Sequence, residues 1–286
     1  MAMKNLRTMT TVLLAAGMLA LGSGPATAAG FGNCEISGPD HVATLKTLSP
    51  DTLTVRPYLP SPGFWNGNSP DSIKDGFEYC LAANIAHRAG LHNLKLVSVS
   101  FAQVVAGQTD AFDIALSQIT ITDERKKVVD FTIPYYDVLT AAMVRKGTKV
   151  TADSIKNDLR IGVERGTTMF DFVRDTIKPQ KDIKVFSDTA GMYSALAARQ
   201  VDVVLFDAAT LLSVAAGSDG RFTVAGVYPD SEMGIGGLVG KKSSNLGAFD
   251  KILSSLKSDG TLAQLEKKYL SPAMGGKLPS ELPVIK

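Results

Sequence analysis

The sequence predicts an α/β fold, because strand and helix signals alternate along most of the chain. The alternation runs from about residue 53 to residue 129 and starts again near residue 159. Roughly 258 residues remain after an N-terminal leader, a length at the upper end for one domain and comfortable for two.

The leader has the organisation of a secretory signal peptide. Lys4 and Arg7 form a short positive region, Thr11–Leu21 is apolar, and Ala26–Ala28 offers a small-x-small cleavage pattern. A membrane anchor is the alternative, but the apolar run is shorter than the roughly 20 residues that a spanning helix needs. Cys34 lies too far past the cut to accept a lipid. We therefore predict cleavage after Ala28 and an exported, unanchored chain.

Charge and composition exclude several classes of protein. The full chain carries 30 Lys+Arg and 28 Asp+Glu, and the leader holds two of the basic residues, so the mature chain has no net charge. A nucleic-acid-binding protein would show a basic excess, so we expect no nucleic-acid partner. The three histidines (His41, His87 and His92) lack metal-ligand spacing, which predicts no metal site.

Two cysteines, Cys34 and Cys80, allow one disulfide. An exported chain meets an oxidising compartment, where such a pair can form. The alternative is a free, buried Cys80 on a helix. Sequence separation does not decide between them, because it does not say whether the two Cα atoms come close.

Each predicted element of the first half rests on a local signal. A strand over Leu53–Arg56 leads into a loop broken by proline and glycine, Pro57–Gly76. The next helix places Phe77, Leu81 and Ile85 on one face and ends at Gly90. The later elements are strand Leu94–Val99, helix Phe101–Ala106, strand Phe112–Leu116 and helix Thr122–Val129, whose first turn is acidic.

The second half repeats this order. Strand Leu159–Val163 leads into a helix with Met169, Phe172 and Ile177 on one face. Strand Val185–Phe186, helix Ala190–Arg199, strand Val201–Phe206, helix Leu246–Leu256 and a last helix from Thr261 follow. Two strand-like segments, Ala141–Val144 and Ile235–Val239, have no helix directly after them. We interpret them as crossovers between lobes, and Met274–Ile285 as a loose tail.

Three predicted strand ends carry polar residues: Ser117–Thr120, Arg165–Thr168 and Asp207. In open α/β sheets, ligands bind at the carboxyl ends of strands. Thr168 precedes a helix, whose unpaired N–H groups attract an anion, but it equally suits a simple helix cap. Arg125 in a first helical turn opposes the helix dipole, so it needs a carboxylate or lies in solvent. Asp207 either caps the following helix or pairs with a cation.

No catalytic motif accompanies these residues. The chain has no Gly-x-Ser-x-Gly elbow, no phosphate-binding loop and no dinucleotide fingerprint after a strand. We therefore expect no catalytic residue and no cofactor.

The run Leu116–Tyr136, read Leu-Ser-Gln-Ile-Thr-Ile-Thr-Asp-Glu-Arg-Lys-Lys-Val-Val-Asp-Phe-Thr-Ile-Pro-Tyr-Tyr, closely resembles the signature of family 3 extracellular solute-binding proteins. These are the polar amino-acid receptors of ABC importers. Further segments follow in the family's order: Gly76–Glu78, Gly162–Thr168, Val201–Asp207 and Lys257–Leu262. The resemblance covers roughly residues 52–270.

The resemblance implies two doubly wound lobes joined by two hinge strands, as in type II periplasmic binding proteins, that close on a ligand. We expect residues 1–28 to be the signal peptide and 29–50 an N-terminal extension. Residues 51–142 with 237–286 would form the first lobe, and 143–236 the second. The chain would be a periplasmic monomer that hands an amino acid to the membrane subunits of an ABC importer.

The resemblance also implies roles for the strand-end residues. Arg125, Thr120 and the backbone N–H of Thr168 would hold the α-carboxylate of the ligand. Asp207 would pair with the α-ammonium, and the backbone carbonyl of Gln118 would assist it.

The side-chain end of the site is less regular. Tyr58 takes the selector position and Ser61 the stacking position. Phe64, Trp65 and Phe101 are candidates for an apolar wall, although they would look identical as core residues. Tyr58 favours a neutral or aromatic ligand side chain, whereas an inward Arg165 would favour an acidic one.

Two other functions compete with reversible binding. One is an enzyme on the same scaffold, resembling cyclohexadienyl dehydratase, whose prephenate-like substrate has no α-ammonium for Asp207. The other is the sensor module of a receptor, for which the sequence shows no accompanying span or signalling domain.

Overall fold

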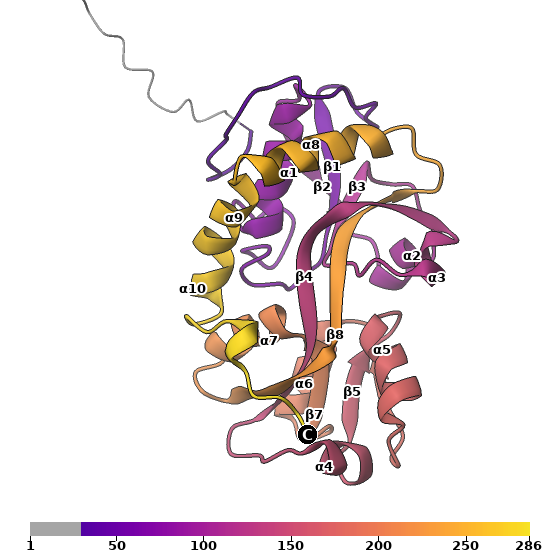
Figure 1. Ribbon diagram of the computed structural model, residues 1–286, viewed down its shortest axis with the longest axis vertical. Helices are drawn as coiled ribbons and strands as arrows, with labels where there is room; N and C mark the ends of the chain where they lie inside the picture. Colours follow the sequence, from indigo (N-terminus) through magenta and orange to yellow (C-terminus); the bar gives the residue numbers. More distant parts are fainter. Residues whose placement is uncertain (1–29) are drawn as a thin grey trace, which may run out of the picture.

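The computed structural model describes residues 30–286, without the side chains at 229–232 and 280. Two lobes lie one above the other, joined by two long strands (Figure 1). The predicted two-lobe α/β fold is confirmed. The predicted leader, residues 1–28, lies outside the described residues.

One eight-stranded sheet runs through both lobes in the order β2-β1-β3-β8-β4-β7-β5-β6. Its strands are β1 Thr52–Pro57, β2 Asn93–Leu96, β3 Ile114–Leu116, β4 Val129–Arg145, β5 Ile161–Glu164, β6 Lys184–Phe186, β7 Val203–Asp207 and β8 Phe222–Gly240. β1 pairs in parallel with β2 and β3, and β5 pairs in parallel with β6 and β7. These two parallel groups form the centres of the first and second lobe.

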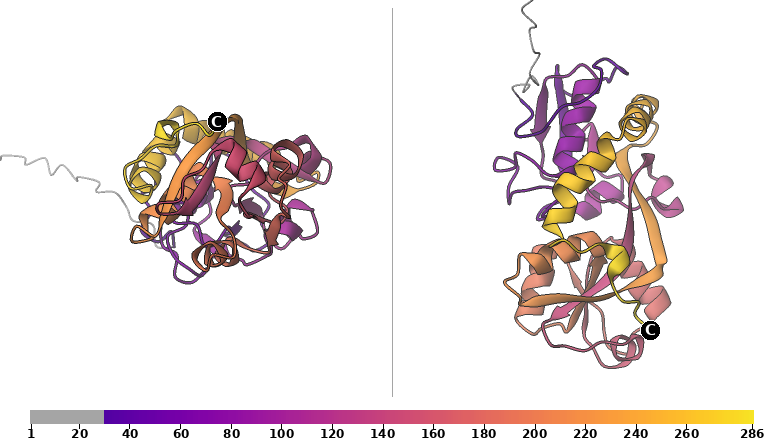
Figure 2. Two further views of the ribbon diagram at one scale, coloured as in Figure 1. Left: turned by 90° about the horizontal axis from the view of Figure 1, so that it is seen from below. Right: turned by 60° about the vertical axis from the view of Figure 1, so that its left-hand side comes forward.

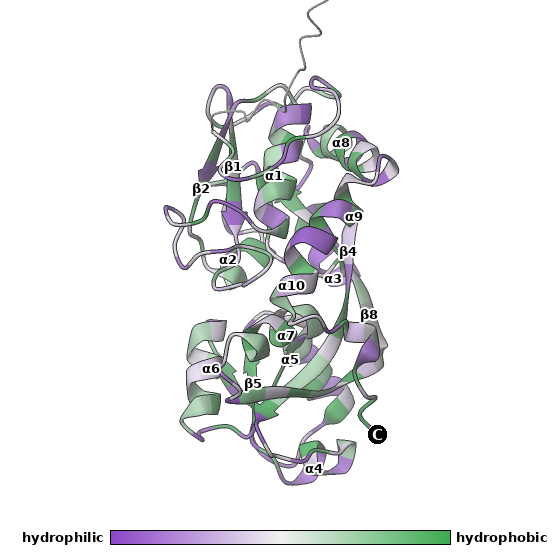
Figure 3. Cartoon of the chain, turned by 90° about the vertical axis from the view of Figure 1, so that its left-hand side faces the viewer, coloured by the Kyte–Doolittle hydropathy of each residue, from purple (hydrophilic) through white to green (hydrophobic). Residues whose placement is uncertain are grey.

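Helices cover the sheet in each lobe. They are α1 Phe77–Arg88, α2 Phe101–Val105, α3 Asp123–Lys126, α4 Ala152–Asn157, α5 Thr168–Phe172, α6 Thr189–Ala197, α7 Ala208–Ala216, α8 Leu246–Ser258, α9 Thr261–Leu265 and α10 Ser271–Ala273. Single π-helical turns continue α5 over Val173–Ile177 and α9 over Glu266–Leu270, and a 3-10 turn spans Pro279–Glu281. Hydrophilic residues gather on outer segments such as the turn that continues α9, Glu266–Leu270, whereas β5 is apolar up to Glu164 (Figure 3). No described helix has the length and apolar character to span a membrane.

The hinge consists of β4 and β8, which are antiparallel to each other over most of their length. The segments predicted as crossovers, Ala141–Val144 and Ile235–Val239, lie within these strands. Residues 141–142, which we assigned to the first lobe, pair with β7 of the second. The chain of β4 therefore passes from the first lobe to the second before residue 141, near the register shifts between Phe131 and Thr140.

Residues 30–50 lie against the first lobe and are tied to it by a disulfide. Cys34 and Cys80 are bonded, with their Cα atoms 5.3 Å apart. Cys80 is fully buried on α1, in the core of the first lobe. The alternative of a free Cys80 is therefore excluded.

The last residues do not form a loose tail. After α10 the chain leaves the first lobe and reaches the second, where it ends (Figures 1 and 2). Val227 of β8 exchanges two backbone hydrogen bonds with this tail, to Pro283 O at 2.9 Å and from Ile285 N at 3.0 Å. Ala152 N donates to Lys286 O at 2.9 Å. These residues belong with the second lobe and not, as predicted, with the first.

Candidate ligand-binding site

A small cavity lies between the lobes at the ends of β1, β3 and β7. It is lined by Tyr58, Phe101, Ser117, Gln118, Thr120, Arg125, Thr167, Thr168, Met169, Phe206 and Asp207. The cavity has a volume of about 10 Å³, which is about the space of one water molecule. The structure therefore has its lobes closed upon each other.

Arg125 is buried in this cavity, so its interpretation as a solvated residue is wrong. Its backbone N–H donates to the side chain of Thr122, the N-cap of α3. The guanidinium donates to Thr120 O at 2.8 Å and, across the cleft, to Gly166 O at 2.9 Å. It also lies 5.7 Å from the centre of the Phe101 ring. The cap and these contacts hold the cation inside the cavity.

Asp207 ends β7 and precedes α7, but its side chain makes no capping hydrogen bond. The carboxylate is 3% exposed, and its Oδ1 has no hydrogen-bond partner among the described residues. An unpaired buried carboxylate oxygen costs free energy. Its interpretation as a helix cap is therefore wrong, and the carboxylate is available to a cation in the cavity.

Burial and the attraction between the two charges shift the pKa values of both groups. Burial raises the pKa of Asp207 to about 7, against the lowering effect of Arg125. Burial also lowers the pKa of Arg125 to about 10, against the effects of Asp171 and Asp207. Arg125 therefore stays protonated at neutral pH, whereas Asp207 is close to half-ionised.

Gln118 is fixed by a buried carboxylate. Glu78 accepts from Gln118 N at 2.9 Å and Nε2 at 3.2 Å, and also from Trp65 Nε1 at 2.5 Å and from the Tyr135 hydroxyl. Gln118 has a left-handed backbone with φ 51°, a conformation uncommon for a residue other than glycine. Its Oε1 accepts from Ser61 at 3.0 Å and, across the cleft, from Thr210 at 2.9 Å.

Three threonines contribute hydroxyl groups near Arg125. Thr167, and not Thr168, is the N-cap of α5, where its side chain accepts from Phe170 N. Thr168 is the first residue of that helix, so its N–H has no partner within the helix. The hydroxyls of Thr168 and Thr120 are 3.4 Å apart across the cleft.

Four candidates for the site do not line the cavity: Ser61, Phe64, Trp65 and Arg165. Ser61 bonds to the side chain of Gln118, and Trp65 is fully buried with its Nε1 bonded to Glu78. Phe64 is fully buried against Phe77 and Tyr136 in the first lobe, away from the cavity. Arg165 is exposed and does not line the cavity. Phe64 packs against core rings and Arg165 is exposed to solvent, so neither lies beside Arg125 in the cavity.

Three residues in or next to the cavity were not predicted from the sequence. Phe206 and Met169 line the cavity, and Glu164 binds the hydroxyl of Tyr58. Phe206 is next to the end of β7 and Glu164 ends β5, so the rule that ligands bind at strand ends would have pointed to both.

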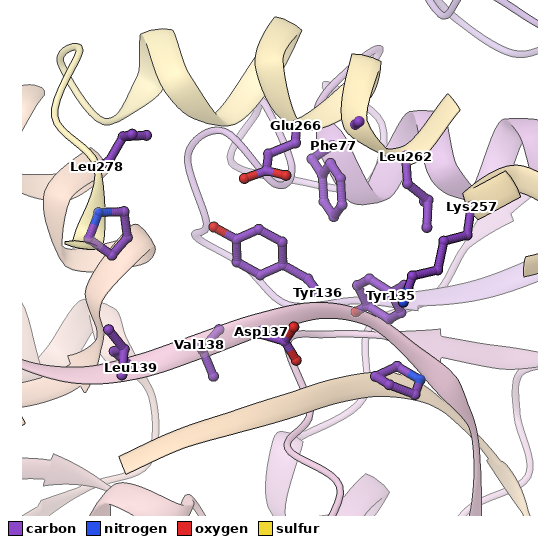
Figure 4. A pocket seen from close by; sticks show the side chains of 13 residues that line it. Phe77, Tyr135, Tyr136, Asp137, Val138, Leu139, Lys257, Leu262, Glu266 and Leu278 are labelled. Carbon is purple, nitrogen blue, oxygen red and sulfur yellow. The ribbon is translucent and has the colours of Figure 1, made fainter. Parts of the chain in front are cut away.

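A larger cavity, of about 490 Å³, lies between β4 and the C-terminal helices. Phe77, Tyr136 and Leu262 project into it (Figure 4). Its charged residues Asp137 and Lys257 are exposed, and Glu266 is partly exposed, so water can solvate them. The smaller cavity, with its buried and unpaired charge, is the better candidate for the binding of a charged ligand. Among residues 30–286 no group of three or more His, Cys, Asp or Glu side chains is placed to hold a metal ion.

Known proteins are similar to this chain in sequence and in fold. The chain is 27% identical over 203 residues to the L-cystine-binding protein TcyJ of Escherichia coli (strain K12), covering 70% of this chain and 75% of that protein. A mutant of ArgBP from T. maritima is 29% identical, with a TM-score of 0.67, and covers 77% of this chain and 96% of that one. An ancestral amino acid-binding protein described as a precursor of cyclohexadienyl dehydratase is 26% identical, with a TM-score of 0.67 and coverage of 77% and 96%.

The model of the bacterial extracellular solute-binding proteins, family 3, matches residues 62–272. This range includes the signature run, the disulfide-bonded helix α1 and every cavity residue except Tyr58. The chain belongs to the bacterial extracellular solute-binding proteins of family 3.

Proposed function

We propose that the protein captures a free amino acid between its two lobes in the periplasm and delivers it to the membrane subunits of an ABC importer. The observation that carries this proposal is the pair of buried, opposite charges in one interlobe cavity, Arg125 and Asp207. An amino acid presents one anion and one cation on a single carbon atom. The relatives named above as amino-acid-binding proteins support the same assignment.

In this proposal, each α-group meets the opposite charge. The ligand carboxylate replaces the carbonyl contacts of Arg125 and accepts from Thr120 and from the N–H of Thr168. The ammonium donates to Asp207 Oδ1, which gives this buried oxygen a partner. The ligand thus bridges the first lobe, which holds Arg125, and the second, which holds Asp207.

We propose binding without chemistry, by a periplasmic monomer. A dehydratase resembling cyclohexadienyl dehydratase is the alternative, since an ancestral neighbour is described as its precursor. A prephenate-like substrate lacks an α-ammonium, so it would leave Asp207 buried and unpaired. Recovery of the ligand unchanged after incubation with the protein separates the two functions.

The test of the function uses ligands with one α-group blocked. For the amino acid that binds most tightly in calorimetry, the methyl ester removes the anion and the N-acetyl form removes the cation. We expect each form to bind roughly thirty-fold or more weakly, because one buried charge of the protein loses its partner. Undiminished binding of the N-acetyl form would exclude the amino-acid function and favour a ligand with a carboxylate alone.

We also expect affinity to fall as pH decreases below about 7, the pKa of Asp207 without ligand. Only the ionised carboxylate pairs with an ammonium, so binding at pH 6 must release a proton. The affinity then falls by roughly tenfold per pH unit well below that pKa. Calorimetry at pH 6 and pH 8, in buffers of different ionisation enthalpy, measures both effects.

Glu164 titrates in the same range, because burial raises its pKa to about 7 against the effects of Tyr58 and Arg56. Glu164→Gln therefore serves as the control and should keep the pH dependence, whereas Asp207→Asn should lose it. Equal affinity at pH 6 and pH 8 would contradict the pairing of Asp207 with the ammonium.

A further inference from the structure

One residue of the cavity lining has a backbone conformation that its side chain disfavours. Gln118 follows the end of β3 by two residues and has a φ of 51°. For a residue with a Cβ atom, this left-handed conformation costs free energy, and it persists only where the surrounding structure imposes it. Since Gln118 lines the cavity together with Asp207, the groups that impose this conformation also shape the cavity.

The carboxylate of Glu78 holds both N–H groups of Gln118. Gln118 N donates to Oε1 at 2.9 Å, and Nε2 donates to Oε2 at 3.2 Å. Glu78 lies at the start of α1 and is fully buried. Its other two donors are Trp65 Nε1, at 2.5 Å, and the Tyr135 hydroxyl. Burial raises the pKa of Glu78, against the lowering effect of these four bonds. Four donors match the four lone-pair sites of an ionised carboxylate.

Glu78 also determines which way the amide of Gln118 points. A carboxylate accepts hydrogen bonds and donates none, so it takes the nitrogen of the amide and leaves the oxygen for other partners. That oxygen accepts from Ser61 at 3.0 Å and from Thr210 at 2.9 Å. Thr210 belongs to the second lobe, in the first turn of α7, the helix that follows Asp207. The Gln118 side chain therefore joins the two lobes beside Asp207.

The backbone carbonyl of Gln118 remains available as an acceptor. None of the hydrogen bonds that Gln118 makes with the described residues uses this oxygen. Its direction depends on the left-handed conformation, and that conformation depends on the two bonds to Glu78. Glu78 itself does not line the cavity, so it acts on the site only through Gln118.

We propose that Glu78 is a positioning residue, which holds Gln118 so that its carbonyl accepts from the ligand ammonium and its side chain bonds to Thr210 when the lobes close. This inference rests on the proposed function. Without the carboxylate, both N–H groups of Gln118 lose their acceptor. The backbone would then relax to a commoner conformation, and the amide would be free to turn its nitrogen toward Thr210.

The test is a double-mutant cycle between Glu78→Gln and Gln118→Gly, with affinity for the best amino-acid ligand measured by calorimetry. Glu78→Gln alone should weaken binding roughly tenfold or more, because it disturbs both the carbonyl contact and the bond between the lobes. Glycine adopts a positive φ without strain and has no amide to orient, so in the Gln118→Gly background the same change should cost less than about threefold. Equal losses in both backgrounds would overturn the inference.

A buried carboxylate elsewhere in the first lobe provides the matched control. Asp113 accepts from Leu48 N at 2.8 Å and Thr54 N at 2.7 Å, and it does not line the cavity. Asp113→Asn should lower the melting temperature and leave the affinity unchanged. An equal loss of affinity in Asp113→Asn and Glu78→Gln would overturn the inference, because reduced stability alone would then explain both. If Glu78→Gln does not fold, Glu78→Asp replaces it in the cycle, since it keeps the charge and withdraws both oxygens from Gln118.

Hydrogen exchange tests the positioning without a ligand. In NMR, the backbone N–H of Gln118 should exchange roughly tenfold faster or more in Glu78→Gln than in the wild type, and at the wild-type rate in Asp113→Asn. An unchanged rate in Glu78→Gln would overturn the inference. Equal losses in the cycle, with a wild type that still rejects the N-acetyl form of the ligand, would overturn this inference and leave the proposed function intact. Binding of no amino acid by the wild type would overturn both.

Discussion

Arg125→Ala and Asp207→Ala should each weaken binding of the best amino-acid ligand by roughly thirty-fold or more. Either change leaves one charged group of the ligand buried without its partner, which costs about 2–5 kcal/mol. Calorimetry with both variants measures the loss. Lys126→Ala and Asp137→Ala are matched controls, since both side chains are exposed, and they should bind as the wild type does.

A loss of binding must be distinguished from a loss of the folded state. For Asp207→Ala, the melting temperature of the protein without ligand makes this distinction. Burial raises the pKa of Asp207 in the folded protein to about 7, above the usual aspartate value of 3.8. A raised folded-state pKa stabilises the protein below about pH 4, and this contribution is lost as pH rises through 7. Asp207→Ala should therefore melt no lower than the wild type at pH 8 without ligand. A folded Asp207→Ala that binds as tightly as the wild type would rule out the pairing.

Removal of the disulfide should have the largest effect on stability. Cys34 and Cys80 are 46 residues apart in sequence, and closing a loop of this length restricts the unfolded chain by about 4 kcal/mol in the chain-entropy model. Cys34→Ala combined with Cys80→Ala should lower the free energy of unfolding by about that amount. Urea denaturation with and without reductant measures it.

The double variant, Cys34→Ala with Cys80→Ala, is the control for the effect of the reductant on stability. Reductant should bring the wild type down to the stability of the double variant and leave the variant unchanged. Affinity for the ligand should stay the same, because neither cysteine lines the cavity. Two free thiols in the denatured, unreduced wild type would contradict the disulfide.

The charged part of the site could be predicted only in part from the residues themselves. Asp207 stands out because it ends an apolar strand, whereas Arg125 lies within the charged run Asp123–Lys127 and was assigned to the ligand by the resemblance to the family. The aromatic part could not be predicted in this way. Phe64 and Phe101 look alike in sequence, and only the fold places the first in the core and the second in the cavity.

The long hinge strands were only partly predicted, for a physical reason. In the first lobe β8 also pairs with β3, in the second lobe β4 also pairs with β7, and the register between β4 and β8 shifts along their length. No single alternation of apolar and polar residues therefore runs along them, and only the regular stretches 141–144 and 235–239 could be predicted. The bond between Tyr58 and Glu164 was missed because it joins residues 106 positions apart across two lobes.

The course of the C-terminal tail means that three segments of chain, and not two, connect the lobes. Opening the cleft must either break the hydrogen bonds of Val227 and Ala152 to the tail or bend the tail where it leaves the first lobe. Gly275 and Gly276 lie at that point, after Met274, which caps α10, and both have positive φ, of 68° and 75°. Glycine accepts such angles without strain, so the pair can act as a pivot. An affinity tag added after Lys286 would therefore be attached to the second lobe, beside the tail's hydrogen bonds to it.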